Sequence, residues 1–583
     1  MIFRSRRTGA QVGMPAAMWR GLGPNRYDVA AAILLLAILI AIAHGARDFA
    51  QPLSALEATP ISLSPWVLPE YALQSTLRMF AAILVSLLFT FTVATLAAKS
   101  RRAGQIIIPT LDILQSVPVL GFLTFTVVFF MGLFPGGRLG AELAAIFAIF
   151  TSQAWNMAFS FYQSLKTVPG ELDEAARHFR LSPWMRFWRL EAPFAAPGLI
   201  WNTMMSMSGG WFFVVASEAI TVGKTEVRLP GIGSYLALAI EEKNLLAVGQ
   251  AIVAMAVVIL IYDQIVFRPI VAWADKFRAE QTAGVLAPRS WVLDILRRTR
   301  ALRTAGTLWR ETADQIERAI ARLAPAIHGT RTGDSSARFE TIWNGLIFAA
   351  VGWGLWTIAS YIHAHLGFAD LGAVLLGGLA TLIRVVVLIA LASLIWVPVG
   401  VWVGLRPGIA DRIQPLAQFL AAFPANVMFP IFVMAIAAFR LDPNIWLSPL
   451  MILGAQWYIL FNVIAGASAF PNDLRDATTL MGARGWQWWR SVILPGIFPY
   501  YVTGALTATG GAWNASIVAE VVSWGETRLS AMGLGAYIAH ATEAGDMPRV
   551  VLGIAAMSGF VVLFNALLWR RLYAYAERKL RFD

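Results

Sequence analysis

Residues 385–405 read VVVLIALASLIWVPVGVWVGL, an unbroken run without an acidic or a basic side chain. A helix that crosses the hydrocarbon core of a bilayer needs about 20 mostly apolar residues. A backbone surrounded by lipid must satisfy its own hydrogen bonds, which favours a helix over an open strand. This run therefore predicts one membrane-spanning helix.

Twelve stretches of this kind occur, six in each half of the chain, and they predict an all-α polytopic membrane protein with about twelve transmembrane helices. They are 29–46, 79–98, 113–137, 143–165, 192–217, 244–262, 341–369, 385–405, 413–439, 443–472, 491–519 and 550–569. The first stretch follows several arginines and also resembles a secretory signal. We favour a retained helix, because 341–369 occupies the matching place in the second half.

The composition supports the same class of protein. Hydrophobic residues make up 58% of the 583 positions and charged residues only 14%, whereas soluble domains carry roughly 25% charged residues. A soluble enzyme and a disordered chain are therefore both disfavoured. The chain has no Cys and only 6 His, so we expect neither a cofactor nor a metal site.

Charge predicts the orientation. If the N-terminus is cytoplasmic, the predicted cytoplasmic segments hold 36 of the 46 Lys and Arg residues, and the opposite side holds 8. This asymmetry matches the excess of positive charge found in cytoplasmic loops. Both termini are then cytoplasmic. The net charge of +12 belongs to alternate loops in contact with the lipid bilayer, and we expect no nucleic-acid partner.

The two halves repeat each other at a shift of 302 to 306 residues. The matched pairs are Arg78 with Arg384, Pro118 with Pro424, Trp155 with Trp457, Pro193 with Pro495, Gly209 with Gly511, Trp211 with Trp513 and Glu218 with Glu520. Each half has an even number of predicted spans, so both share one orientation about a parallel pseudo-two-fold axis. The predicted units are residues 1–268, a basic cytoplasmic linker 269–338, and residues 339–583. The linker is either a plain connection or partly helix on the membrane surface.

A long polar segment separates the fourth and fifth predicted spans of each half. Each reads as a short helix, a turn and a second helix that carries large aromatic side chains. Acidic residues at the start suit the positive end of a helix dipole. Gly482 permits a tight turn in the second copy. Pro193 and Pro495 are expected to end the segments before the next span.

These segments resemble the EAA loops of ABC-importer permeases. The first copy has Glu174, Ala175, Ala176 and, 19 residues after Glu174, Pro193. The second has Asp476 and Ala477, with Gly482 at the turn and Pro495 at the same offset of 19. The first copy departs from the pattern, with Arg180 at the glycine position; Arg484 follows the turn of the second copy.

The resemblance implies a type I ABC importer-like fold in a bacterial inner membrane. Its implied partners are two cytoplasmic ABC ATPase subunits, which dock on the loops, and a periplasmic or lipid-anchored solute-binding protein. ATP hydrolysis would then belong to separate subunits, so the chain itself is not expected to be an enzyme. Gly209-Gly210-Trp211 and its copy around Trp513, each followed by a Gly-rich piece, resemble permeases for nitrate, sulfonate, taurine and bicarbonate. Here two such permease domains are fused in tandem.

Two Trp–Glu pairs are candidate pathway residues. Trp211 precedes Glu218 by seven residues, and Trp513 precedes Glu520 by the same interval. Seven residues are about two helical turns, so each pair shares one face. That face either lines the outer half of the pathway or consists of a backbone-bonded Glu and an interfacial Trp.

Arg78 and Arg384 begin the second span of each half. A cation here would attract an anionic substrate. Each Arg would alternatively pair with Glu218 or Glu520, or extend to the lipid headgroups.

Other classes of function fit the sequence less well. A twelve-helix secondary transporter driven by an ion gradient would place ionisable residues deep within spans, and it would not require two matched loops. A membrane-embedded enzyme needs clustered catalytic groups, and a scaffold leaves the duplication unexplained. Gly223-Lys224-Thr225 resembles part of a phosphate-binding loop, but Glu218 stands where its first Gly is required.

Overall fold

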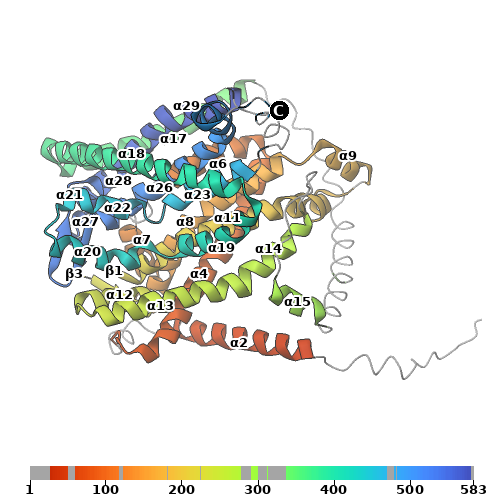
Figure 1. The fold of residues 1–583 in the computed structure, drawn as a ribbon. Helices are drawn as coiled ribbons and strands as arrows, with labels where there is room; N and C mark the ends of the chain where they lie inside the picture. The colour runs from red at the N-terminus through yellow and green to blue at the C-terminus, as the bar shows by residue number, and fades with distance from the viewer. Residues whose placement is uncertain are drawn as a thin grey trace, which may run out of the picture.

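The computed structural model describes residues 26–49, 60–116, 123–179, 181–222, 225–277, 290–299, 312, 337–468, 470, 478, 480, 482 and 484–579. Nearly all of these residues are helical, as the apolar stretches predict. Figure 1 shows the helices gathered into one bundle, with most of the long ones running in similar directions.

The first half contains thirteen described α-helices. They are α2 (Arg26–Phe49), α4 (Leu68–Phe89), α5 (Thr95–Lys99), α6 (Arg101–Ser116), α7 (Leu123–Leu133), α8 (Arg138–Lys166), α9 (Gly170–His178), α10 (Pro183–Arg186), α11 (Ala192–Glu218), α12 (Ile232–Glu241), α13 (Leu245–Tyr262), α14 (Arg268–Ala274) and α15 (Trp291–Arg298). In the second half they are α17 (Ala337–His365), α18 (Phe368–Gly404), α19 (Pro407–Ala422), α20 (Phe429–Ala438), α21 (Pro443–Trp446), α22 (Ser448–Ile452), α23 (Gln456–Ser468), α25 (Gly485–Trp488), α26 (Leu494–Ala519), α27 (Leu534–Ala544), α28 (Met547–Phe564) and α29 (Arg570–Lys579).

The same three helices form the centre of each half. In the first half, α8 packs against both α4 and α11. In the second half, α23 packs against both α18 and α26. The two halves meet where α11 contacts α19 and the 3-10 turn η7 (Ala425–Met428). One polar contact there is Asn426 Nδ2, which donates to the Phe212 carbonyl at 3.1 Å.

Two short antiparallel hairpins, which the apolar pattern did not predict, follow the fifth span of each half. Strand β1 (Ala219–Val222) pairs with β2 (Thr225–Arg228), and β3 (Val521–Trp524) pairs with β4 (Thr527–Ser530). The hairpins cross between halves, since β1 contacts α27 and β3 contacts α12. At the second hairpin, Gly525 N–H donates to the Ile240 carbonyl at 2.9 Å.

Six helices of the described residues are long and apolar enough to cross a membrane, and up to eight if each bent pair is one span. The prediction of an all-α polytopic membrane protein is confirmed, whereas the number of twelve spans stays a prediction, because part of 113–137 lies outside the described residues. The predicted span 413–439 bends by 75° where Arg412–Ala422 gives way to Ala425–Ala438. Pro424 lies at this break. Its ring removes a backbone donor and restricts the preceding residue, which explains why the helix is interrupted here. A second bend, of 43°, separates Pro443–Ile452 from Gln456–Ser468.

The prediction that Pro193 and Pro495 end the polar segments is wrong, because the helical backbone continues through both prolines. Pro193 lies in the first turn of α11 and Pro495 in the first turn of α26, and a π-turn leads directly into each helix. These turns are η4 (Phe187–Glu191) and η8 (Trp489–Ile493). A wider turn accommodates a residue without a backbone N–H. Because the two turns are 302 residues apart, the repeat extends to irregular backbone.

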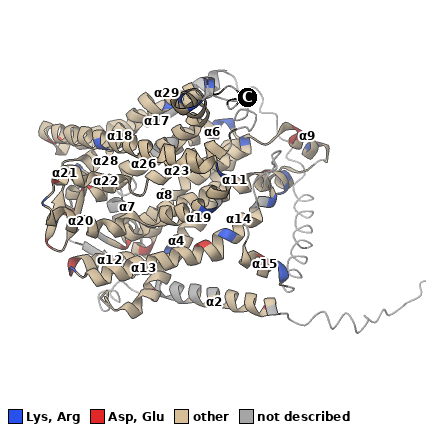
Figure 2. Cartoon of the chain, in the orientation of Figure 1, with Lys and Arg blue, Asp and Glu red and all other residues tan. Residues whose placement is uncertain are grey.

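The outer surface of the bundle is apolar and its charges are sparse. Phe348, Trp353 and Leu394 are each more than 70% exposed, a placement that suits contact with lipid chains. Charged residues are few along the middle of the bundle and gather mainly near its two ends (Figure 2). The chain is therefore a multi-pass membrane protein.

The linker between the halves is described only in part. Helix α15 buries Val292 and exposes Trp291, and Arg298 Nη1 donates to the Tyr27 hydroxyl of α2 at 3.0 Å. Within the linker, residues 278–289, 300–311 and 313–336 lie outside the described residues.

Candidate functional site

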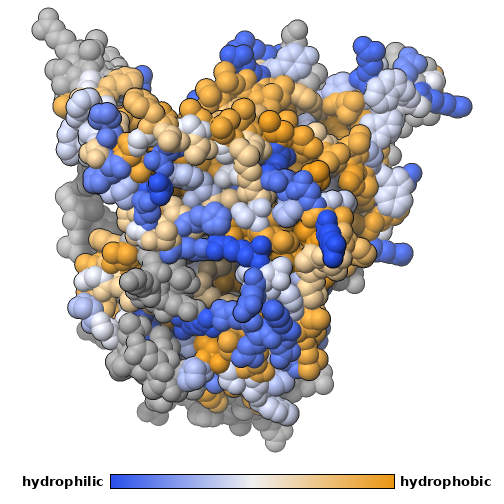
Figure 3. All heavy atoms as spheres, turned by 90° about the vertical axis from the view of Figure 1, so that its left-hand side faces the viewer, coloured by the Kyte–Doolittle hydropathy of each residue, from blue (hydrophilic) through white to orange (hydrophobic). Residues whose placement is uncertain are grey.

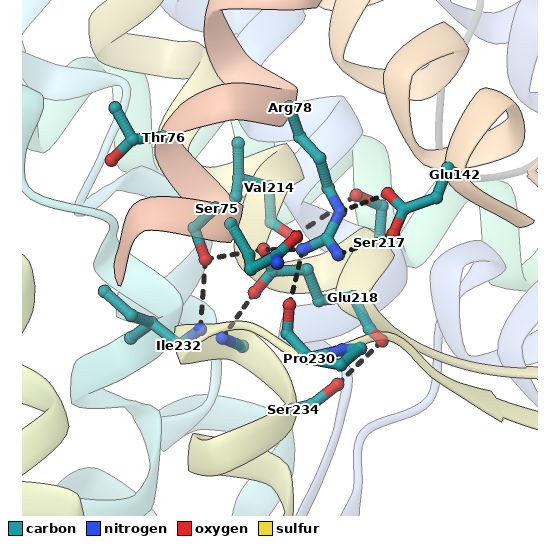
Figure 4. A network of polar contacts seen from close by, with 12 residues as sticks. Ser75, Thr76, Arg78, Glu142, Val214, Ser217, Glu218, Pro230, Ile232 and Ser234 are labelled. Carbon is teal, nitrogen blue, oxygen red and sulfur yellow. Dashed lines mark hydrogen bonds and ion pairs between the residues drawn. The ribbon is translucent and has the colours of Figure 1, made fainter. Parts of the chain in front are cut away.

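Arg78 joins the three central helices of the first half (Figure 4). Its Nε lies 2.6 Å from Glu142 Oε2 of α8, and its Nη1 lies 2.8 Å from Glu218 Oε1 of α11. A further bond from Nη2 to Glu142 makes that pair bidentate. All three side chains are fully buried. Such closely paired and hydrogen-bonded geometry is what makes buried charges tolerable.

A second arginine completes the network. Arg138 Nε lies 2.9 Å from Glu142 Oε1, one helical turn away on α8. With Arg78 and Glu218, the cluster contains two cations and two carboxylates, so its formal charges balance. This balance suits the apolar interior of a membrane protein, where an unpaired charge is costly.

Glu218 also holds the start of α12. Its Oε2 accepts from Gly233 N–H at 2.6 Å, and its Oε1 accepts from the Ser75 hydroxyl at 2.6 Å. Ser75 Oγ in turn accepts from Ile232 N–H at 3.0 Å. A carboxylate at this position satisfies free donors at a helix N-terminus and complements the helix dipole. A Cβ atom at Gly231 would collide with the Glu218 carboxylate, so the approach requires glycine.

The second half repeats this arrangement with fewer charges. Arg384 Nη1 lies 3.0 Å from Glu520 Oε1, and Thr381 Oγ1 donates to the same oxygen at 2.7 Å. Ala536 N–H donates to Glu520 Oε2 at 3.0 Å. Asn444 occupies the position that corresponds to Glu142. Its main-chain carbonyl accepts from Arg384 Nε at 3.3 Å. The Arg384 side chain is 12% exposed, so the second pair is less enclosed than the first.

The alternative in which each Arg pairs with a Glu is the one that the structure shows. Trp211 and Trp513 are both fully buried, and they stack on Tyr262 and Phe560 at ring-centroid distances of 5.7 and 6.4 Å. Arg78, Arg384, Glu218 and Glu520 lie in the interior of their own halves. Five of these six side chains therefore do not line an open surface in this conformation, and Arg384 is partly exposed. A role in the pathway stays a prediction.

Sequence reasoning missed several members of these clusters. Glu142 lies immediately outside the apolar stretch 143–165, so a search for uncharged runs does not select it. Ser75 and Thr381 each lie three residues before an arginine, at the same shift of 306. That regularity is visible in the sequence. The pairing of Arg78 with Glu142 is not, because 64 residues separate them.

The first polar segment forms the predicted short helix, α9. Pro169 precedes it, and the Leu172 and Asp173 N–H groups donate to the Pro169 carbonyl. Glu174 and Ala175 are exposed, whereas Ala176 is buried. Arg180 lies outside the described residues.

The second polar segment is described only in part. Asp476 and Ala477 lie outside the described residues. Gly482 has φ of +69°, the left-handed region that glycine adopts without steric cost. Arg484 is exposed and directly precedes α25.

Helix α9 and the two hairpins lie at opposite ends of the bundle (Figure 1). Seen from the hairpin end, hydrophilic side chains run across the middle of the face, with hydrophobic side chains above them (Figure 3). At the α9 end, large apolar side chains are exposed: Leu172, Phe179, Trp184 and Trp188 are 40%, 75%, 51% and 45% exposed. Apolar groups gathered on a polar loop typically mark a docking surface. Within the described residues, no group of three or more His, Asp or Glu is placed to hold a metal ion.

Comparison with known proteins identifies the class. Residues 87–268 and 397–582 each match the family described as "Binding-protein-dependent transport system inner membrane component". The two matches together cover more than half of the chain. The protein therefore belongs to this family of inner-membrane transport components, and it contains the domain twice.

Individual relatives refine this assignment. The chain is 28% identical over 188 residues to a nitrate import permease protein, NrtB, of Leptolyngbya laminosa, a match covering 32% of this chain and 64% of the relative. It is 29% identical over 176 residues to a bicarbonate transport system permease protein, CmpB, of Synechococcus elongatus, covering 30% and 60%. It is 26% identical over 180 residues to the taurine transport system permease protein TauC of Escherichia coli, covering 31% and 62%. The chain thus spans less than two thirds of each relative's length. These relatives are permease components, and each is about half as long as this chain.

Proposed function

We propose that this chain is the transmembrane permease subunit of an ATP-driven importer, in which two fused permease domains form the translocation pathway. The observation that carries the proposal is the duplicated family domain, with a polar segment after the fourth predicted span of each copy. Residues 1–268 and 339–583 would be the two domains, and 269–338 the cytoplasmic linker. Both chain termini would be cytoplasmic, in line with the charge asymmetry of the loops.

The proposed solute is a small anion such as nitrate, bicarbonate or a sulfonate. Relatives named for nitrate, bicarbonate and taurine transport support this class. The proposed pathway lies between the two halves, where α11 meets α19 and η7. The proposed partners are two ATPase subunits on the α9 side and a solute-binding protein on the hairpin side.

The ATPase subunits would dock on the two polar segments. Around α9, exposed apolar side chains next to exposed Glu174 provide a surface that requires a covering partner. Gly482 supplies the turn of the second segment through its left-handed backbone. Residues Ala175, Ala176, Arg180, Pro193, Asp476, Ala477, Arg484 and Pro495 would shape or flank these two surfaces.

The test is co-purification of the chain with its candidate ATPase, followed by ATPase assays in lipid vesicles. The intact chain is expected to bind the ATPase, and the double variant Glu174→Lys with Gly482→Trp is expected to lose it. Uptake of nitrate, bicarbonate and taurine is then measured with the solute-binding protein present. Uptake that depends on an ion gradient and does not depend on ATP would instead establish a secondary transporter.

A further inference from the structure

Four charged side chains link the first polar segment to the base of the second span. Arg186 Nη2 of α10 lies 2.7 Å from Asp173 Oδ1 of α9, and Arg186 Nε lies 2.9 Å from Glu191 Oε1. Glu191 Oε2 lies 2.9 Å from Lys99 Nζ at the end of α5. We call Asp173, Arg186, Glu191 and Lys99 the ionic relay, because their charges alternate along one connected path.

The two carboxylates of the ionic relay are more sheltered from water than its two cations. The Glu191 side chain is 7% exposed and that of Asp173 19%, compared with 33% for Arg186 and 41% for Lys99. An isolated surface ion pair contributes only about 0–1 kcal/mol. The attraction within an ion pair is stronger where the carboxylate is buried, because water screens it less there.

The relay reaches the helix that carries Arg78. Helices α4 and α5 and the π-turn η2 (Thr90–Ala94) form one continuous run, Pro65–Lys99. Lys99 is the last residue of this run, and Arg78 in its middle is bonded to α8 and α11. Ion pairs therefore connect α9 to the helical run that carries Arg78 at the centre of the first half.

The second half has no such relay at the matching positions. At a shift of 302, Arg186 corresponds to Trp488 and Glu191 to Ile493. At a shift of 306, Lys99 corresponds to Leu405. Trp488 and Trp489 instead pack against the apolar interior of the bundle. The first segment is thus attached by ion pairs in addition to the packing of Phe187 on Phe161, whereas the matching positions of the second segment carry no charge.

We propose that Arg186, Glu191 and Lys99 are positioning residues for the first ATPase-coupling segment only. They transmit movement of α9 to the second span through ion pairs, which the matching positions of the second segment lack. This inference rests on the proposed function, in which α9 contacts an ATPase subunit. It predicts that energy coupling is sensitive to salt in one half and not in the other.

The experiment measures anion uptake per ATP hydrolysed in vesicles that contain the full transporter complex. The variants are Arg186→Met and Lys99→Met, which remove a charge while retaining an aliphatic side chain. The matched control is Arg177→Met, because Arg177 also pairs with Asp173, at 2.8 Å, but is 72% exposed and lies outside the relay path. Lys99→Arg keeps the charge and serves as the rescue variant.

We expect the two relay variants to retain the ATPase subunits and to lower the uptake per ATP about fivefold, the lower end of typical coupling effects. Arg177→Met and Lys99→Arg should remain within about twofold of the natural protein. Raising the ionic strength to about 1 M, where the screening length is about 3 Å, should lower the ratio for the natural protein. It should not lower the ratio further in Arg186→Met. Recovery of the ratio in Lys99→Arg would show that the charge, and not the packing of the side chain, is what coupling requires.

Three results would overturn the inference. The first is an unchanged ratio in both relay variants, and the second is an equal loss in Arg177→Met. The third is loss of ATPase binding in the relay variants, which would assign these residues to the docking surface itself. Failure of the natural chain to bind any ATPase is a different result, which refutes the proposed function. Lys99 is the most exposed member, so Lys99→Met provides the test if Arg186→Met fails to fold.

Discussion

Replacing Arg78 by Met should destabilise the protein much more than replacing Arg384 by Met. Arg78 is fully enclosed and bonded to two carboxylates. Its removal leaves Glu218 buried and without a cationic partner, whereas Glu142 retains Arg138 at 2.9 Å. Breaking a buried ion pair by removing one partner costs about 3–5 kcal/mol. Arg384 pairs with one carboxylate and is 12% exposed, so its loss should cost about 1.5–3 kcal/mol, the range for a hydrogen bond to a charged group.

The assay is equilibrium unfolding of the purified chain in mixed micelles, followed by tryptophan fluorescence. The control is the double variant Arg78→Met with Glu218→Gln, which removes the uncompensated charge and should recover part of the lost free energy of unfolding. Equal costs for the two arginine variants, within about 0.5 kcal/mol, would refute the reasoning. A double variant less stable than Arg78→Met would refute it as well.

Two further predictions concern close approaches of the backbone. Gly231→Ala and Gly533→Ala should each lower the free energy of unfolding by about 1–3 kcal/mol, because the added Cβ would collide with the Glu218 or Glu520 carboxylate. The control is Gly249→Ala in α13, where a Cβ would meet nothing within 4 Å, and it should be neutral or stabilising. An equal loss in the Gly249 variant would contradict the prediction. The cysteine pair Gly525→Cys with Lys243→Cys should crosslink under mild oxidation in a chain that has no other cysteine, since the Lys243 side chain lies against Gly525. After proteolysis within 269–338, the two halves should then migrate together on a denaturing gel, and separate migration would place the second hairpin away from the first half.

The sequence predicts helices well where one physical requirement dominates. Length and apolarity place most of the spans, because a helix in lipid has few alternatives. The break at Pro424 is foreseeable from the missing backbone donor, but its angle depends on the helices packed around it. The hairpins are four-residue strands between a helix end and a glycine-rich turn, too short for a clear alternating pattern.

The functional residues are predictable in kind rather than in arrangement. The duplication alone singles out Arg78, Glu218 and their copies, because rare charged residues recur at a nearly constant shift. The sequence alone does not decide whether these arginines pair with these glutamates, because the distance along the chain does not determine which buried charges lie in contact. Glu142 shows the difficulty most clearly, since a rule that searches for uncharged stretches sets aside a charge at the edge of one.

Fusion of the two domains explains why their equivalent sites can differ. In a symmetric dimer of identical chains, every residue occupies both halves, so each substitution must suit two places at once. A fused chain removes that constraint. Glu142 can then become Asn444, and Arg186 can become Trp488, without any change in the other half. The first half thereby keeps a core of four charges and an ionic attachment of its polar segment, while the second half retains one Arg–Glu pair in its core and has uncharged residues at the matching attachment positions. The differences fall at the Arg–Glu core and at the attachment of the polar segments, so the divergence argues for unequal roles of the two halves.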